Sequence, residues 1–132
     1  MTLEADQLIE ALQLAPHPAG CHYRETFRDG DGRGISSAIH FLLKAGEVSW
    51  WHRIDAAEIW HFHRGAPLEL HIGDRMRILG PLVEQGQAPQ LVDSKGPWQM
   101  ARSLGDYTLA GCTVAPGFIF ETFELAPRDF RP

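Results

Sequence analysis

A histidine and a glutamate in one short stretch are the residues of this sequence best suited to chemistry. His52 and Glu58 lie between Gly46 and Gly65 in the run GEVSWWHRIDAAEIWHFHRG. An imidazole and a carboxylate in one partly apolar cavity can transfer protons near neutral pH, because burial moves their pKa values. The two side chains can also form a buried hydrogen-bonded pair with a structural role only. Both interpretations stay open at this point.

Two aromatic residues follow Glu58 at a spacing that matters if this stretch is a β-strand. Successive side chains of a strand point to opposite faces, so Glu58, Trp60 and Phe62 share one face. Together with His52 they would form a pocket with aromatic walls and a few polar groups, which is the usual form of a small-molecule site. The sequence therefore predicts that a small polar metabolite binds here.

A second pair of histidines, His61 and His63, lies on the opposite face of the same predicted strand. If the next strand pairs with it, Glu69 and His71 also point outward. We therefore interpret His61, Glu69 and His71 as a polar outer patch or a subunit contact rather than as a catalytic centre.

Short β-like runs separated by turns make up most of the chain. Before them, apolar residues at helical spacing predict one helix over residues 3–13, which two prolines then end. The expected strands recur at a pitch typical of an antiparallel sandwich or barrel, and they span 22–27, 36–43, 48–53, 58–63, 68–72, 75–79, 90–92, 98–101, 107–115 and 118–125. We expect a single domain over residues 1–132, with the helix and a lead-in over 1–15 and a β-barrel over 22–125.

Composition limits the partners of this chain. Of its 132 residues, 44% are hydrophobic and 22% are charged, a balance typical of one globular domain. The formal net charge of -5, without a cluster of Lys or Arg, argues against nucleic acid and anionic membranes as partners, because phosphate binding needs a basic face. No apolar run approaches the roughly 20 residues of a membrane helix, and the acidic N-terminus lacks the basic flank of a signal peptide. We therefore expect a cytoplasmic protein.

The spacing of the stretch around His52 resembles a known motif. Gly46, His52, Glu58 and Gly65 match the first motif of the cupin superfamily, G-x(5)-H-x-H-x(3,4)-E-x(6)-G, and Ile54 stands where the second histidine of that motif belongs. The resemblance implies an all-β fold, the cupin-type double-stranded β-helix or jelly-roll barrel. In this chain a short N-terminal α-helix is expected to precede it.

Longer phrases resemble one branch of that superfamily, the DUF985 or cupin_5 family, which is RmlC-like in fold. They are YRETF, AIHFLL, HRIDAAEIWHFHRG, LGPLVEQGQAPQLV and GDYTLAGCTVAPGFIFETFEL, and they cover the chain from 23 to 125. Tyr107 and Glu121 belong to the last phrase. The predicted substrate-binding residues are Trp60, Phe62, Gln99, Tyr107 and Glu121, and which of Tyr107 and Glu121 faces the pocket stays open.

The second cupin motif, G-x(5)-P-x-G-x(2)-H-x(3)-N, is matched best by residues 94–99. Gly96 is kept there, and Gln99 takes the position of the histidine. Metal-dependent cupins hold a divalent ion with three histidines and a glutamate, and only His52 and Glu58 remain of that set. A stable site normally uses three or four N, O or S donors, so we expect no metal and no other cofactor.

Two classes of function stay open, and a third is kept in reserve. The first is a metal-independent acid-base isomerase or epimerase of a sugar-like or keto substrate, similar in fold to sugar-nucleotide epimerases, with His52 and Glu58 as catalytic residues. The second is a non-catalytic module that binds a small molecule. The third is a metal-dependent cupin in which His52 and Glu58 hold a divalent ion. Whether the chain is an enzyme is not decided by its sequence.

A homodimer is also expected. Cupins commonly associate in pairs, and the edges of an open double sheet need covering. Four tryptophans in a chain of 132 residues further favour an apolar surface that a partner would cover.

Overall fold

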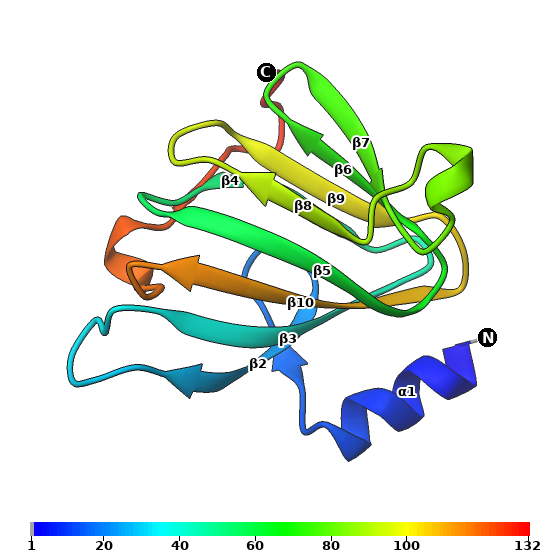
Figure 1. Cartoon of the computed structure of the whole chain (residues 1–132), viewed down its shortest axis with the longest axis horizontal. Coiled ribbons are helices and arrows are strands. Elements are labelled where there is room, and N and C mark those ends of the chain that lie inside the picture. Colours follow the sequence, from blue (N-terminus) through cyan, green and yellow to red (C-terminus); the bar gives the residue numbers. More distant parts are fainter. Residues whose placement is uncertain (1) are drawn as a thin grey trace.

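Two antiparallel β-sheets form most of the molecule, and one short helix precedes them (Figure 1). The computed structural model describes residues 2–132, with side chains from Glu4 onward. The helix α1 spans Thr2–Ala11, close to the predicted range. The strands and the two 3-10 turns are β1 (Ala15–Pro16), β2 (His22–Arg28), β3 (Ser37–Lys44), β4 (Val48–Arg53), β5 (Ala57–Gly65), β6 (Leu68–Ile72), β7 (Arg75–Leu79), η1 (Val83–Gln85), β8 (Gln90–Asp93), β9 (Gln99–Ser103), β10 (Tyr107–Ala115), η2 (Phe120–Thr122) and β11 (Glu124–Leu125).

The two sheets pack face to face, and the chain passes repeatedly from one to the other. The six-stranded sheet has the order β1-β2-β3-β10-β5-β8, and the five-stranded sheet has the order β11-β4-β9-β6-β7. Consecutive strands from β3 to β6 therefore alternate between the sheets, as they do in a double-stranded β-helix. The predicted all-β jelly roll with an N-terminal helix is confirmed, and the bounds of β4, β6, β7 and β10 are the predicted ones.

The strand predicted over residues 118–125 is wrong. This segment forms the 3-10 turn η2, and only the two residues of β11 pair with β4. Phe118 and Phe123 pack instead against Ile54, Ala56 and Val114. Because its phenylalanines pack on this apolar cluster, the segment crosses one end of the barrel and does not extend a sheet.

The predicted pairing of the strands around His61 and Glu69 is also wrong, because β5 and β6 belong to different sheets. His61 lies on the six-stranded sheet, where its Nε2 is 3.3 Å from Oγ1 of Thr113. Glu69 lies on the five-stranded sheet, where its Oε2 is 3.0 Å from Nε2 of His71 and also accepts a hydrogen bond from Arg102. The expected outer patch is therefore two separate polar groups.

The main core fills the space between the sheets. Trp60 is its largest fully buried side chain, and Phe41 packs edge-on against it with ring centroids 4.9 Å apart. A second apolar cluster lies on the outer side of the six-stranded sheet, where Leu8 of α1 packs against Leu42 and Leu109. The helix therefore covers the outside of the barrel and leaves its interior to the strands.

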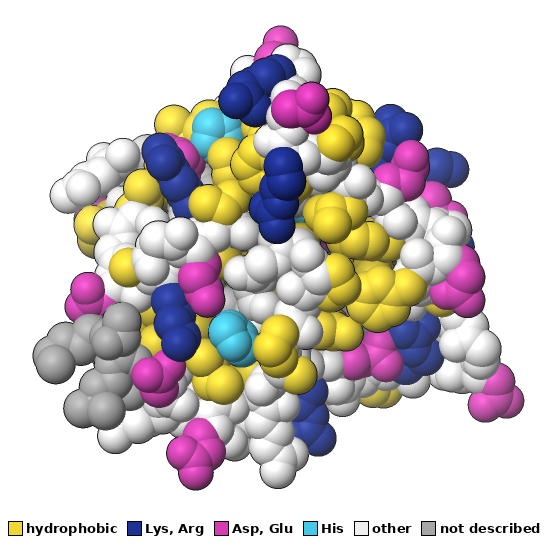
Figure 2. Space-filling model, turned by 180° about the vertical axis from the view of Figure 1, so that it is seen from behind, with side chains coloured by type: hydrophobic (Ala, Val, Ile, Leu, Met, Phe, Trp, Pro, Cys, Tyr) yellow, Lys and Arg dark blue, Asp and Glu magenta, His cyan; other side chains and the backbone are white. Residues whose placement is uncertain are grey.

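Charged side chains of both signs are spread over the surface. On the face shown in Figure 2, Lys and Arg side chains lie among Asp and Glu side chains, and this face carries no continuous basic patch. Such a face is unsuited to a polyanion. No helix within residues 2–132 has the length and apolar character needed to span a membrane.

Gly65, the last glycine of the first motif, has a structural role that a substitution tests. Its φ is +91°, and an added Cβ would lie 2.5 Å from the carbonyl oxygen of Tyr107. Gly73 has a φ of +62° but open space around the same position. We expect Gly65→Ala to lower the free energy of unfolding by at least about 2 kcal/mol more than Gly73→Ala does, because only Gly65→Ala adds a backbone overlap to the strain of a positive φ. Urea denaturation measures both variants, and equal losses would contradict this explanation.

Candidate functional site

A small cavity lies between the two sheets, beside the segment that contains η2. Its volume is about 40 Å³. Such a volume has room for about three water molecules. Its walls are mostly apolar and aromatic, with five polar side chains among them. The lining residues are His17, Tyr23, Ile39, Phe41, Ser49, His52, Ile54, Glu58, Trp60, Val114, Phe118 and Phe123.

His52 contributes an imidazole whose tautomer is fixed by the backbone. Its Nδ1 lies 2.6 Å from the carbonyl oxygen of Trp50. A carbonyl only accepts, so Nδ1 carries the hydrogen and Nε2 keeps its lone pair. Burial lowers the pKa of His52, and the hydrogen bond to Trp50 opposes this change. The ring stacks on Phe123 with centroids 5.4 Å apart, and among the described residues its Nε2 has no hydrogen-bond partner. His52 is thus a neutral base with one available nitrogen.

His17 has the opposite tautomer. Its Nδ1 accepts a hydrogen bond of 3.0 Å from the backbone N–H of Ala19, so the hydrogen of the neutral ring is on Nε2. Burial, and to a lesser degree the nearby His52, lower the pKa of His17 to about 4. The ring packs edge-on against Tyr23 with centroids 4.7 Å apart. At neutral pH the cavity therefore contains one imidazole that accepts a hydrogen bond at Nε2 and one that donates there.

Glu58 is the carboxyl group of the cavity, and buried side chains hold it in place. Nε2 of Gln99 donates a hydrogen bond of 2.7 Å to Oε1 of Glu58, and Oε1 of Gln99 accepts one of 3.2 Å from Trp60. The thiol of Cys112 donates a further hydrogen bond to Glu58. Burial raises the pKa of Glu58, although the hydrogen bonds from Gln99 and Cys112 favour the carboxylate. Glu58 therefore keeps its proton to a higher pH than an exposed glutamate.

A second buried carboxyl group lies beside Glu58. Asp93 of β8 is the cross-strand partner of Glu58 in β5, so the two side chains share one face. Oδ1 of Asp93 is buried and has no hydrogen-bond partner within the described part of the chain. Burial, and to a lesser degree the charge of Glu58, raise the pKa of Asp93 to about 7. Since like charges this close disfavour each other, the pair retains a proton near neutral pH.

Ser49 adds a hydroxyl group that is free to bind a ligand. The side chain lines the cavity and is 1% exposed, and its Oγ has no partner among the described residues. A buried hydroxyl without a partner is costly, so a ligand or a water molecule is expected to bond to it.

The structure brings together several of the residues predicted from sequence. His52, Glu58 and Trp60 all line the cavity. Gln99 is fully buried behind Glu58 and fixes it, but it is not part of the lining. Phe62 lies on the inner side of β5, where it packs against the main core away from the cavity.

Tyr107 and Glu121 lie outside the cavity. Tyr107 is buried with Leu109 in the cluster beneath α1, because side chains alternate along β10 and Val114, which lines the cavity, points the other way. Glu121 is exposed within η2. The resemblance of this segment to the family therefore did not indicate which way the two side chains point.

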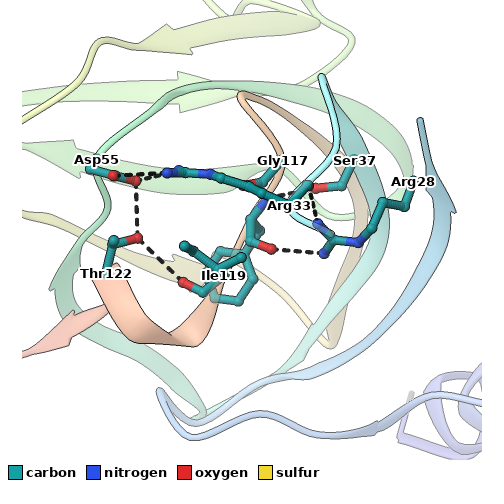
Figure 3. A network of polar contacts seen from close by, with 8 residues as sticks. Arg28, Arg33, Ser37, Asp55, Gly117, Ile119 and Thr122 are labelled. Atoms are coloured by element: carbon teal, nitrogen blue, oxygen red, sulfur yellow. Dashed lines mark hydrogen bonds and ion pairs between the residues drawn. The ribbon is translucent and has the colours of Figure 1, made fainter. Parts of the chain in front are cut away.

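A network of hydrogen bonds fixes the segment that borders the cavity (Figure 3). Nε of Arg33 donates a bond of 2.6 Å to the carbonyl oxygen of Gly117, and the guanidinium also pairs with Asp55. Oδ1 of Asp55 accepts a hydrogen bond of 2.9 Å from Oγ1 of Thr122. The Arg33 guanidinium lowers the pKa of Asp55 to about 2, so this pair stays charged at neutral pH.

A second arginine holds the start of the same segment. Arg28 donates a hydrogen bond of 2.7 Å to the carbonyl oxygen of Phe118, and the backbone N–H of Phe118 donates one of 3.0 Å to Oγ of Ser37. Both backbone groups of Phe118 are therefore bonded. The two networks keep the rings of Phe118 and Phe123 against the cavity.

The residues at the metal-ligand positions of the cupin motifs do not suit a divalent ion. Ile54 has no donor atom, and both polar atoms of the Gln99 side chain are bonded to other buried side chains. Of the four positions, only His52, through Nε2, and Glu58 keep a donor atom for a metal, whereas a stable site normally uses three or four donors. Within residues 2–132, no three side chains of His, Cys, Asp or Glu are grouped as a metal site requires.

Two facing antiparallel sheets around a small interior cavity define a cupin-type barrel. Residues 6–126 match the family model Cupin_5, described as Cupin superfamily (DUF985). The chain therefore belongs to the DUF985 family of the cupin superfamily, as its motifs suggested. A comparison with curated proteins finds no match. Membership of this family points to small-molecule binding or catalysis as the general class of function.

Solved structures agree with this assignment. A hypothetical protein from Leishmania major is 30% identical with a TM-score of 0.86, and the alignment covers 92% of this chain and 86% of that one. Protein SO0799 from Shewanella oneidensis is 36% identical with a TM-score of 0.88, covering 92% of this chain and 84% of that one. KdgF from Halomonas sp. is 15% identical with a TM-score of 0.64, covering 80% and 88%, and shows likeness of fold alone.

The raised pKa of Asp93 gives a testable dependence of stability on pH. Asp93 binds its proton more tightly in the folded chain, so its contribution to stability is complete below the ordinary pKa of 3.8 and is lost as the pH rises through about 7. Between these limits we expect the free energy of unfolding of the wild type to fall by about 1 to 4 kcal/mol because of Asp93. The Asp93→Asn side chain cannot ionise, so this variant should not show that decrease. Urea denaturation across this pH range measures it, and the exposed Asp129→Asn is the control. Parallel curves for wild type and Asp93→Asn would contradict the assignment.

Proposed function

We propose that this protein catalyses a metal-independent proton transfer on a small keto compound, an isomerisation or epimerisation at a carbon next to a carbonyl group. One observation carries the proposal: the available Nε2 of His52 and the carboxyl group of Glu58, whose pKa is raised by burial, line the same cavity. A base and an acid in one partly apolar site can do this chemistry without a metal, and such catalysis contributes roughly 10² to 10⁴-fold.

His52 is the base in this proposal. The hydrogen bond from Nδ1 to the Trp50 carbonyl leaves Nε2 as the proton acceptor, and the lowered pKa keeps the ring neutral before reaction. Nε2 removes the proton from the carbon next to the carbonyl, and the electron pair of that C–H bond forms the double bond of an enol. The Trp50 carbonyl continues to accept the Nδ1 hydrogen when the ring becomes charged.

Glu58 is the acid. The proton that the pair of Glu58 and Asp93 retains near neutral pH passes through Glu58 to the carbonyl oxygen of the substrate as the enol forms, which avoids a free enolate in an apolar cavity. The resulting carboxylate is stabilised by the hydrogen bonds from Gln99 and Cys112, which favour this form. It also shares the cavity with a newly charged His52. His52 then returns its proton to the same or the adjacent carbon, and Glu58 takes back a hydroxyl proton as the carbonyl group re-forms, which restores both residues.

Two further groups would bind the substrate. Nε2–H of His17 is a donor and the hydroxyl of Ser49 can donate or accept, and both side chains line the cavity without using these atoms elsewhere in the described chain. The volume of about 40 Å³ admits the few atoms of a reacting keto group and not a nucleotide. This favours a small ketose or keto acid, with any larger part of it outside the barrel.

The proposal is tested by the exchange of substrate hydrogen with deuterium from the solvent. Wild-type protein is incubated with keto sugars and 2-keto acids in deuterated water, and deuterium in the recovered compound is measured by mass spectrometry. We expect exchange with at least one compound, and a rate lower by roughly 10² to 10⁴-fold in His52→Asn and in Glu58→Gln. His61→Asn in the outer face of β5 and Glu84→Gln in η1 are matched controls outside the cavity and should exchange at the wild-type rate.

Two outcomes would overturn the proposal. One is no exchange with any compound while a compound still binds, which would identify a non-catalytic binding module. The other is unchanged exchange in the double variant of His52 and Glu58. Circular dichroism and thermal unfolding of each variant separate a lost reaction from a lost fold.

A further inference from the structure

A second, larger cleft lies at the free edges of the two sheets. It is formed by β7, the last strand of the five-stranded sheet, and by β8, the last strand of the six-stranded sheet, and its volume is about 520 Å³. No residue that lines it also lines the barrel cavity. Any ligand of this cleft is therefore independent of the function proposed above.

Two arginines project into this cleft from positions that normally belong to the core. Arg77 is the cross-strand partner of Leu70, and Arg75 is the partner of Ile72. Cross-strand partners share a face, and Leu70 is fully buried between the sheets, so both arginines are on the inner face of β7. Leu79, two residues beyond Arg77 on the same face, is fully buried. Along the inner face of β7, the side chains therefore change from apolar at Leu79 to charged at Arg77 and Arg75, at the border of the core.

Within the described part of the chain, neither Arg75 nor Arg77 has a partner for its charge. Among the described residues, neither guanidinium forms a hydrogen bond, an ion pair or a contact over an aromatic ring, although Asp74 also lines the cleft. Seven other arginines of this chain, in contrast, form ion pairs or hydrogen bonds with carboxylates or carbonyl groups, namely Arg24, Arg28, Arg33, Arg53, Arg64, Arg102 and Arg131. Two unpaired like charges on one face repel each other, and an anion between them would relieve this.

The rest of the cleft combines apolar surface with polar groups. Leu91 and Val92 of β8 and Ile72 of β6 line it, together with Gln90 and Ser94. Ile72 is the cross-strand partner of Arg75, and Leu91 faces the interior of the barrel, so apolar surface lies on the same side as the arginines. Such a lining suits a molecule with an apolar body and one anionic group.

We propose that the cleft between β7 and β8 binds a small organic anion, whose phosphate or carboxylate group lies between Arg75 and Arg77. Guanidinium groups bind both kinds of anion through paired N–H donors. The apolar part of the ligand packs on Ile72 and Leu91, which also line the cleft. The edge of β7 is open here, because the backbone contacts from Ala88 reach only Ile78 and Gly80.

The alternative role of these arginines is to protect a sheet edge. Charged residues that point inward at an edge strand discourage pairing with another chain. This role predicts no ligand, and it predicts self-association when the charges are removed. The two roles therefore differ in measurable ways.

The test uses the full chain labelled with ¹⁵N and phenyl phosphate as the probe. We expect saturable shifts of the backbone amides of β7 and β8 with a Kd at or below about 1 mM. Arg75→Gln with Arg77→Gln should weaken binding at least roughly tenfold, and Arg128→Gln with Arg131→Gln, which removes the same charge elsewhere, should change it less than about twofold. Phenol, which lacks the anionic group, should leave these amides unshifted.

Three results would overturn the proposal. They are shifts that do not saturate, equal shifts with phenol, and equal weakening by the two double variants. Sedimentation of the Arg75 and Arg77 variant adds a separate readout, since self-association with unchanged phenyl phosphate shifts would identify edge protection as the role of the arginines.

Discussion

The buried amide of Gln99 joins the two sheets at the centre of the barrel. Gln99 belongs to β9 of the five-stranded sheet, whereas Glu58 and Trp60 belong to β5 of the six-stranded sheet. The amide donates to the carboxyl group at 2.7 Å and accepts from the indole at 3.2 Å. Because these groups are shielded from water, loss of the amide would leave two buried polar atoms unsatisfied. The position of the acid in the cavity and the orientation of the main core tryptophan thus depend on one side chain.

Burial then determines which groups of the interior are charged. It lowers the pKa of His17 and His52 and raises the pKa of Glu58 and Asp93, so each of these groups is shifted toward its neutral form. Permanent charge is kept at the border, where Arg33 and its carboxylate partner hold the segment beside the cavity. An interior whose titratable groups are shifted toward their neutral forms, and which contains both a base and an acid, can take up and release a proton.

Local rules predicted part of this site, and long-range packing decided the rest. The alternation of side chains along one strand correctly placed Glu58 and Trp60 on the inner face, and the spacing of the motif indicated the jelly-roll fold. Ser49 was missed because β4 is irregular between it and His52, so residues three apart both face the cavity. His17 comes from the segment before the first long strand, and no local pattern shows that it folds back to the barrel. The expected homodimer and cytoplasmic location stay predictions.

The most direct test of this account is the protonation state of the two cavity imidazoles. Long-range ¹H–¹⁵N correlation spectra of histidine-labelled protein at neutral pH distinguish the tautomers of each ring. We predict that His52 is neutral with its hydrogen on Nδ1 and that His17 is neutral with its hydrogen on Nε2, as their bonds to Trp50 and Ala19 require. A charged His52, or a His52 with its hydrogen on Nε2, would contradict its assignment as the base of the cavity.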